Sequence, residues 1–159
     1  MSEGEGHVFT RGGLDPEPGL PGWWRWPLGE GLQFGAILEP LSLQGGNGRA
    51  RLRMVPSAVH RNLRGSVHGG ALMSFVDMAL FAACYVNGLR DGARGTTLDC
   101  SVQFIGPASE QQPVIADVEV LRETGRLVFL RGLLVQGEPE QTVASFTGTI
   151  RKAPRRNPA

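Results

Sequence analysis

The sequence predicts an α+β fold in which one long buried helix packs against a largely antiparallel sheet of about six strands. Residues 69–87 are apolar on almost every side, which indicates a helix that other parts of the protein cover. The strand-like segments that follow are joined by connections of three to eight residues, which are too short for parallel crossovers. The order of a hairpin, a helix and four consecutive strands is typical of a helix layered on a sheet.

The strands are predicted from alternation, apolar content and turn residues. Residues 34–41 are the first candidate, and the glycine-rich turn at 45–48 joins them as a hairpin to 49–54, where apolar residues alternate with arginines. The segment from Arg126 to Val135 is strongly apolar and is expected in the interior of the sheet. The four later strands are predicted over 96–105, 113–122, 126–135 and 142–151.

We expect one domain, over residues 32–152, flanked by two segments of different composition. Residues 1–31 are rich in glycine and proline and should be irregular. They also hold all three tryptophans of the chain, so this segment should dock on the core, either as a surface cover or as a lid or wall of a ligand pocket. Residues 153–159 form a basic tail that we expect to be flexible.

Composition argues against several classes of protein. A net charge of +1 argues against a nucleic-acid partner, and the absence of a stretch of about 18 or more apolar residues predicts that no segment spans a membrane and that the protein has no membrane partner. The N-terminus lacks the hydrophobic region of a signal peptide, so we expect a cytoplasmic protein. Cys84 and Cys100 lie in apolar segments and should be small buried side chains rather than a disulfide or a metal site.

One carboxylate lies within the predicted helix. Asp77 is the only charged residue between Gly70 and Val86. Burying an unpaired carboxylate is costly, so Asp77 should be paired, hydrated or chemically active. The helix opens with His68, Gly69 and Gly70, and a helix start offers free backbone N–H groups and the positive end of the helix dipole. A carboxylate together with such a helix start suggests acyl-transfer chemistry.

The spacing of these groups predicts that two chains form the site. Gly69 and Asp77 are eight residues apart on one helix, or about 12 Å at 1.5 Å per residue. An oxyanion donor and a base must both come within about 3 Å of the same reacting atoms. A two-fold dimer can meet this requirement by setting the helix start of one subunit near Asp77 of the other. We therefore expect any active site to span a dimer interface.

Residues 62–70 read Asn-Leu-Arg-Gly-Ser-Val-His-Gly-Gly, and Asp77 follows the histidine by nine residues. This pattern resembles the hotdog-fold thioesterases of the phenylacetate-degradation (PaaI-like) type. The segment 95–99 and the Gly-Pro-Ala turn at 106–108 are also similar to the third strand of that family and the turn after it. The resemblance covers roughly residues 33–151. It implies a curved sheet wrapped around one long helix, and a homodimer or a dimer of dimers (homotetramer).

The resemblance also implies an activity, that of an acyl-CoA thioesterase, which hydrolyses a thioester to a free acid and CoA without a metal or other cofactor. Gly69 would donate its N–H to the thioester carbonyl, and Asp77 would act as general base or nucleophile. Asn62 and His68 would order the loop or the attacking water, and Thr97 matches a position where the family places a hydroxyl that helps to hold this water. Structural roles stay open for Asn62 in a turn, for His68 as a helix cap and for Gly69 in close packing.

Alternation of side chains raises a question about Thr97. A regular strand places Thr97 on the same face as Asp99, Ser101 and Gln103. An isolated subunit would expose that face to solvent, so a purely structural role stays open for Thr97 as well.

Substrate contacts follow less directly from the sequence. Gly70 and Arg64 belong to the motif and are candidates for substrate binding, because an arginine is well shaped for the phosphates of CoA. Phe75 and Phe81 could line the acyl pocket, although both also suit an ordinary core. The alternatives are a non-catalytic acyl-CoA-binding hotdog module and another hotdog enzyme such as a dehydratase, which needs a different histidine motif. The identity of the acyl group is not predicted.

Overall fold

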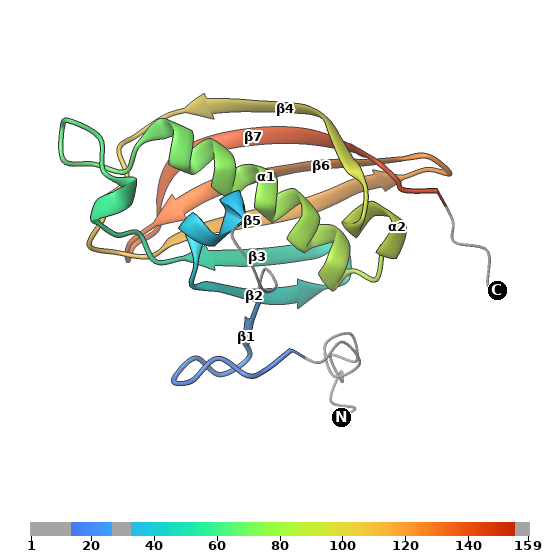
Figure 1. Ribbon diagram of the computed structural model, residues 1–159, viewed down its shortest axis with the longest axis horizontal. Coiled ribbons are helices and arrows are strands. Elements are labelled where there is room, and N and C mark those ends of the chain that lie inside the picture. Colours follow the sequence, from blue (N-terminus) through green and yellow to red (C-terminus); the bar gives the residue numbers. More distant parts are fainter. Residues whose placement is uncertain (1–13, 27–32, 155–159) are drawn as a thin grey trace.

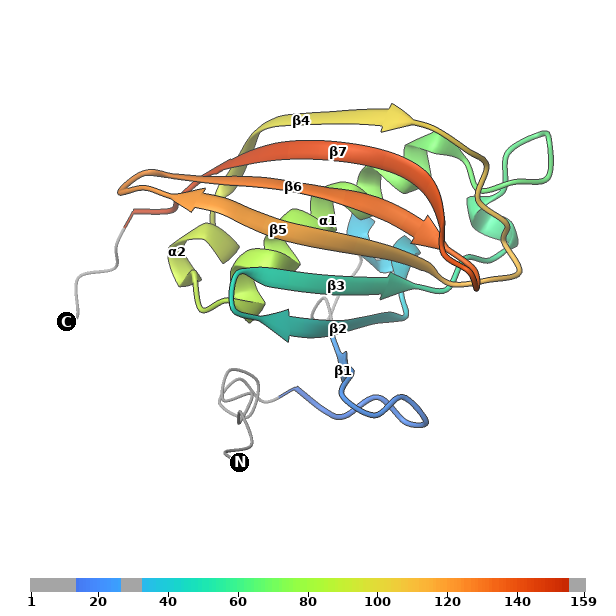
Figure 2. The ribbon, with the colours of Figure 1, turned by 180° about the vertical axis from the view of Figure 1, so that it is seen from behind.

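A computed structural model describes residues 14–26 and 33–154. It shows an α+β architecture in which the long helix α1 (Gly69–Val86) lies across one face of a curved antiparallel sheet (Figures 1 and 2). The predicted fold class is confirmed. The strand order in the sheet is β1-β2-β3-β5-β6-β7-β4.

Six long strands form the body of the sheet, as expected, and a short seventh strand extends it at one edge. β4 forms the opposite edge, and β6 lies between two neighbours, as its apolar sequence predicts. The strands are β1 (Trp24–Arg25), β2 (Leu41–Gly46), β3 (Arg49–Met54), β4 (Thr96–Phe104), β5 (Val114–Glu123), β6 (Leu127–Gln136) and β7 (Gln141–Arg151).

The predicted hairpin exists, but its first strand was placed wrongly. Residues Phe34–Leu38 form a 3-10 helix, η1, and the strand that pairs with β3 begins only at Leu41. The apolar residues of η1 include pairs three and four residues apart, which fits a helix. A segment this short and apolar fits a strand as well, because its length and composition do not separate the two. The turn itself is formed by Asn47 and Gly48, whose positive φ angles of 54° and 80° suit a tight two-residue connection.

Helix α1 supplies much of the core. Nine of its 18 residues are buried, and it packs against β2, β3, β5, β4 and β7. By length and a mean hydropathy of 1.6 it could cross a membrane, which corrects the expectation that no stretch of this kind exists. Half of this span is buried inside the protein. Its contacts with the sheet therefore fit the core helix of a folded domain.

The C-terminal end of α1 is attached to the β2–β3 turn. Asn87 caps the helix, and its side-chain oxygen accepts a hydrogen bond from the Gly48 N–H at 2.6 Å. Its side-chain nitrogen donates to the carbonyls of Arg49 and Ala83. The Asn-Gly stop signal thus ends the helix as predicted and also fixes that end against the sheet. A short helix, α2 (Arg90–Ala93), which the sequence did not indicate, follows.

Part of the tryptophan-rich segment docks on the domain. β1 pairs with β2, so residues expected to be irregular extend the sheet. Trp24 and Trp26 are half-buried and pack against the core, which agrees with the expected docking. Residues 1–13, 27–32 and 155–159 lie outside the described residues, and so does most of the predicted basic tail.

Candidate active site

Asp77 and Thr97 meet at the helix–sheet boundary. The Thr97 hydroxyl donates a hydrogen bond to Oδ1 of Asp77 at 2.6 Å. Both residues are half-buried. Asp77 makes no ion pair within the described part of the chain, so this hydroxyl is the group that holds the carboxylate in place. The structure thus pairs a helix carboxylate with a strand hydroxyl within a single subunit, a contact that the sequence did not predict.

A β-bulge explains how Thr97 reaches the helix. The pairing of β4 with β7 shifts between Thr97 and Asp99, which leaves Leu98 as an extra residue. One extra residue reverses the side-chain alternation. Ser101 lies on the outer face of the sheet, whereas Thr97 points to α1. The expectation that these two residues share a face was wrong for this reason.

The start of α1 is built around His68 and the two glycines. The Nδ1 atom of His68 accepts a hydrogen bond from the Gly70 N–H at 2.8 Å, so His68 acts as the N-cap. The Gly69 N–H has no acceptor among the described residues. A Cβ on Gly69 would lie 3.3 Å from the ring of Phe104, which covers this position from the end of β4. The helix start therefore keeps the Gly69 N–H as a free donor.

Asn62 organises the loop before the helix. Its side-chain oxygen accepts hydrogen bonds from the N–H groups of Arg64 and Ser66, and its side-chain nitrogen donates to the Ser66 hydroxyl. Gly65 lies in this turn with a φ of 84°. Within one subunit Asn62 thus has the structural role that the sequence left open.

A cavity of about 330 Å³ lies next to Asp77. Residues of η1 and α1 line it, together with Cys100 of β4. Apart from Asp77 and Ser74 its side chains are apolar or weakly polar. The lining residues are Phe34, Gly35, Leu38, Met73, Ser74, Asp77, Met78 and Cys100.

The residues predicted to contact substrate lie in different surroundings. Gly70 and Arg64 are exposed, and Phe81 is half-buried against the core. Phe75 is fully buried and does not line the cavity, so within this subunit it is a core residue rather than a pocket wall. In contrast, Phe34 on η1 lines the cavity with 76% of its surface exposed. The sequence analysis missed it because residues 34–41 were interpreted as a strand.

One buried histidine near the site was also missed. His60 is 2% exposed and lies in the short 3-10 helix η2 (Ala58–His60). Its ring lies between two backbone groups, the Ser57 N–H and the Ile37 carbonyl. A single histidine in a loop carries no sequence signal of this arrangement.

The cysteines have no catalytic setting. Burial raises the pKa of the Cys84 thiol to about 12, and burial together with the nearby Asp77 and Asp99 carboxylates raises the pKa of Cys100. Both thiols are therefore held in the protonated form, which is a poor nucleophile. No group of three His, Cys, Asp or Glu side chains that could hold a metal occurs in the described ranges.

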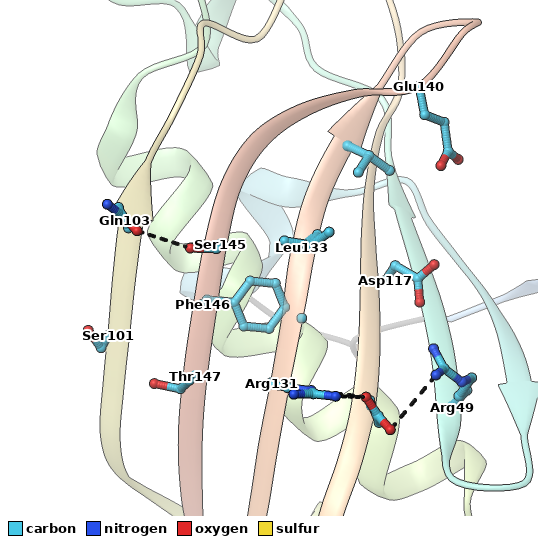
Figure 3. Close-up of a pocket in the computed structure, with 13 residues that line it drawn as sticks. Arg49, Ser101, Gln103, Asp117, Arg131, Leu133, Glu140, Ser145, Phe146 and Thr147 are labelled. Atoms are coloured by element: carbon cyan, nitrogen blue, oxygen red, sulfur yellow. Dashed lines mark hydrogen bonds and ion pairs between the residues drawn. The ribbon is translucent and has the colours of Figure 1, made fainter.

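A larger cavity of about 650 Å³ lies on the face of the sheet that is turned away from α1. Figure 3 shows a row of ion pairs there, in which Glu119 lies between Arg131 and Arg49 at 3.0 and 3.8 Å. Polar side chains of β4 and β7, including Gln103 and Ser145, line its other side. This cavity contains none of the predicted site residues. We therefore assign the candidate active site to the smaller cavity beside Asp77.

The sequence matches a known family. A model of the Thioesterase superfamily matches residues 64–143, half of the chain, and this range includes the helix start, Asp77 and Thr97. The protein belongs to this superfamily, and thioesterase-type function follows from that membership. A comparison with curated proteins finds no match.

Solved structures of a thioesterase superfamily member and of PaaI proteins share the fold. Thioesterase superfamily member 2 from zebra fish has a TM-score of 0.70 at 19% identity, over 78% of this chain and 89% of its own. The PaaI protein of the phenylacetic acid degradation operon of E. coli has a TM-score of 0.61 at 26% identity, over 69% and 79%. A variant of PaaI from Thermus thermophilus has a TM-score of 0.64 at 26% identity, over 75% and 97%. The resemblance to hotdog-fold thioesterases of the PaaI-like type is thus confirmed.

Proposed function

We propose that this protein is an acyl-CoA thioesterase, which hydrolyses an acyl-CoA thioester to a free acid and CoA. The observation that carries the proposal is the Asp77 carboxylate, which Thr97 orients at the edge of a mainly apolar cavity. A carboxylate in such a position can take a proton from water, and the cavity can hold the acyl group beside it. The unpaired Gly69 N–H supplies the donor that a developing oxyanion needs.

The active site requires a second copy of the chain. Gly69 and Asp77 both belong to α1, and their separation of about 12 Å along the helix is too large for one carbonyl group to contact both. The free edge of β4 and apolar side chains near it are available for the second copy. The exposed apolar residues in this region are Phe34, Ile37, Met73, Leu98, Phe104 and Ile105. We propose a two-fold dimer with two equivalent sites, and assembly of two such dimers stays a prediction.

The proposed reaction is a single displacement at the thioester carbonyl. Asp77 of one subunit removes a proton from a water molecule as the water oxygen attacks the carbonyl carbon. The carbonyl oxygen becomes negative and is stabilised by the Gly69 N–H of the other subunit and by the positive end of its helix. The carbon–sulfur bond then breaks and the carboxylic acid is released. The CoA thiolate takes up the proton that Asp77 removed from water. No metal or redox cofactor takes part in this proposal.

The CoA portion should lie outside the cavity, near the loop before α1. A hypothetical thioesterase protein from Streptococcus pneumoniae has a similar fold and was solved with coenzyme A, which supports CoA as the carrier. Arg64 is exposed and makes no ion pair with another described residue, so it is available for a phosphate. Arg61, by contrast, is held by Glu110 through two hydrogen bonds of 2.7 Å.

The first test is thiol release from a panel of acyl-CoAs by the wild type, Asp77→Asn and Asp99→Asn. Asp99 is an exposed carboxylate on the same strand as Thr97 and serves as the matched control. We expect Asp77→Asn to lower kcat/KM by about 100-fold or more, because one general base contributes 10²–10⁴-fold. Asp99→Asn should retain wild-type activity. Binding of acyl-CoA by the wild type without any release would instead support a non-catalytic binding module.

A further inference from the structure

His60 connects the cavity wall to the rest of the domain. Its Nδ1 accepts a hydrogen bond from the Ser57 N–H at 2.9 Å, and a backbone N–H can only donate. These partners assign the proton to Nε2, which donates to the Ile37 carbonyl at 2.5 Å. The ring is almost completely buried, so water does not replace either bond. The neutral imidazole is therefore fully hydrogen-bonded between two segments distant in sequence.

The segment that His60 holds is η1, one wall of the cavity beside Asp77. Phe34 and Leu38, on either side of Ile37, both line this cavity. A five-residue 3-10 helix has few internal hydrogen bonds and little intrinsic stability. Its position against α1, visible in Figure 1, must therefore be set by contacts with other elements. The buried side chain of Leu38 and the hydrogen bond from His60 are two such contacts.

The same residue also fixes the start of α1. The His60 carbonyl accepts a hydrogen bond from the His68 N–H at 2.7 Å, directly before the proposed oxyanion donor. The side chain of His60 thus locates η1, while its backbone locates the helix start. In the proposed dimer this helix start serves the site of the other subunit, so His60 connects the cavity wall of one site to the oxyanion donor of the second.

We propose that His60 is a positioning residue that sets the shape of the acyl cavity and thereby the choice of acyl group. This inference rests on the proposed thioesterase function. Within one subunit the cavity has a volume of about 330 Å³ and a mainly apolar lining, which suits the hydrocarbon part of an acyl group. Acyl groups that extend from Asp77 to η1 depend on the wall, whereas an acetyl group is too short to reach it.

Two substitutions separate the two hydrogen bonds of the ring. In His60→Gln the amide nitrogen lies near the former Nε2 and can still donate to the Ile37 carbonyl. In His60→Asn the shorter amide oxygen lies near the former Nδ1 and can accept only from the Ser57 N–H. The experiment measures kcat and KM for acetyl-, butanoyl-, hexanoyl-, octanoyl- and phenylacetyl-CoA with both variants and the wild type. Circular dichroism and size-exclusion chromatography check folding and assembly.

We expect His60→Asn to raise KM for the best wild-type substrate about tenfold, the equivalent of about 1.4 kcal/mol, with little change in kcat. Its kcat/KM for acetyl-CoA should equal that of the wild type, and His60→Gln should keep the wild-type acyl preference. Equal acyl profiles for His60→Asn and the wild type would overturn the proposal while leaving the thioesterase function intact. A wild type that hydrolyses no acyl-CoA would instead overturn the proposed function, and the positioning role with it.

If His60→Asn does not fold, the variant Phe34→Ala tests whether the η1 wall influences the choice of acyl group. Phe34→Ala removes an exposed ring from the same wall and should leave the core intact. We expect it to change the ratio of kcat/KM between the best substrate and acetyl-CoA. An unchanged ratio would refute the proposal, because a wall without influence on acyl choice needs no positioning residue.

Discussion

Replacing Thr97 by valine removes the hydroxyl that orients Asp77 and changes the size of the side chain very little. A hydrogen bond to a charged group contributes about 1.5–3 kcal/mol. Asp77 is half-buried, so water can replace part of the lost bond, and the lower value of about 1.5 kcal/mol applies. At about 1.36 kcal/mol per factor of ten, we expect kcat/KM to fall about tenfold.

The assay is steady-state thiol release with the substrate that the wild type prefers. Thr97→Ser keeps the hydroxyl and should stay within about threefold of the wild type, since a threefold change is less than 1 kcal/mol. The melting temperature of Thr97→Val should fall by no more than about 6 °C, because each kcal/mol lowers it by about 2–4 °C in a domain of this size. An unchanged kcat/KM in Thr97→Val, or an equal loss in both variants, would contradict the orienting role of the hydroxyl.

Two further predictions concern the reaction path and the core. In a single turnover in H₂¹⁸O the product acid should carry ¹⁸O, because a general base delivers solvent water to the acyl carbon; unlabelled acid would point to Asp77 as a nucleophile. Burial raises the pKa of Cys84, so the folded state resists ionisation of this thiol. The contribution of the neutral thiol to the free energy of unfolding is therefore complete below pH 9 and is lost as the pH rises towards 12. Urea unfolding should therefore show that the free energy of unfolding falls more between pH 8 and pH 10.5 for the wild type than for Cys84→Ala, by up to about 2 kcal/mol. Equal losses of unfolding free energy in the two proteins would contradict burial as the cause of the raised Cys84 pKa.

The elements with a strong periodic signal were predictable from the sequence. The apolar segment before Asn87-Gly88 gave the correct helix end within a residue, and alternation with turn residues placed β3 to β7. The signal failed at Phe34–Leu38, where a short apolar segment fits a strand and a 3-10 helix equally well. Such a segment is decided by its packing on α1 and by the hydrogen bond to Ile37, and neither contact is visible in local sequence.

The sequence predicted which residues belong to the candidate site better than it predicted how they are arranged. Asp77, His68 and Gly69 were indicated by a lone carboxylate and by a glycine-rich helix start. The face of Thr97 was assigned wrongly, since alternation assumes an unbroken pleat and no residue type announces a bulge at Leu98. The role of the neighbouring His60 depends on two backbone groups that are brought together only by the fold.

The bulge at Leu98 also affects how β4 can vary among related proteins. In an unbroken strand, an insertion or deletion turns every later side chain to the other face, so the whole strand must change together. Here the extra residue separates Thr97 from the stretch that follows it along the free edge. Residues 99–104 can therefore diverge to suit different neighbouring surfaces without turning the Thr97 hydroxyl away from Asp77. The end of the strand that carries Thr97 and the edge proposed for dimer contact can therefore change independently in sequence.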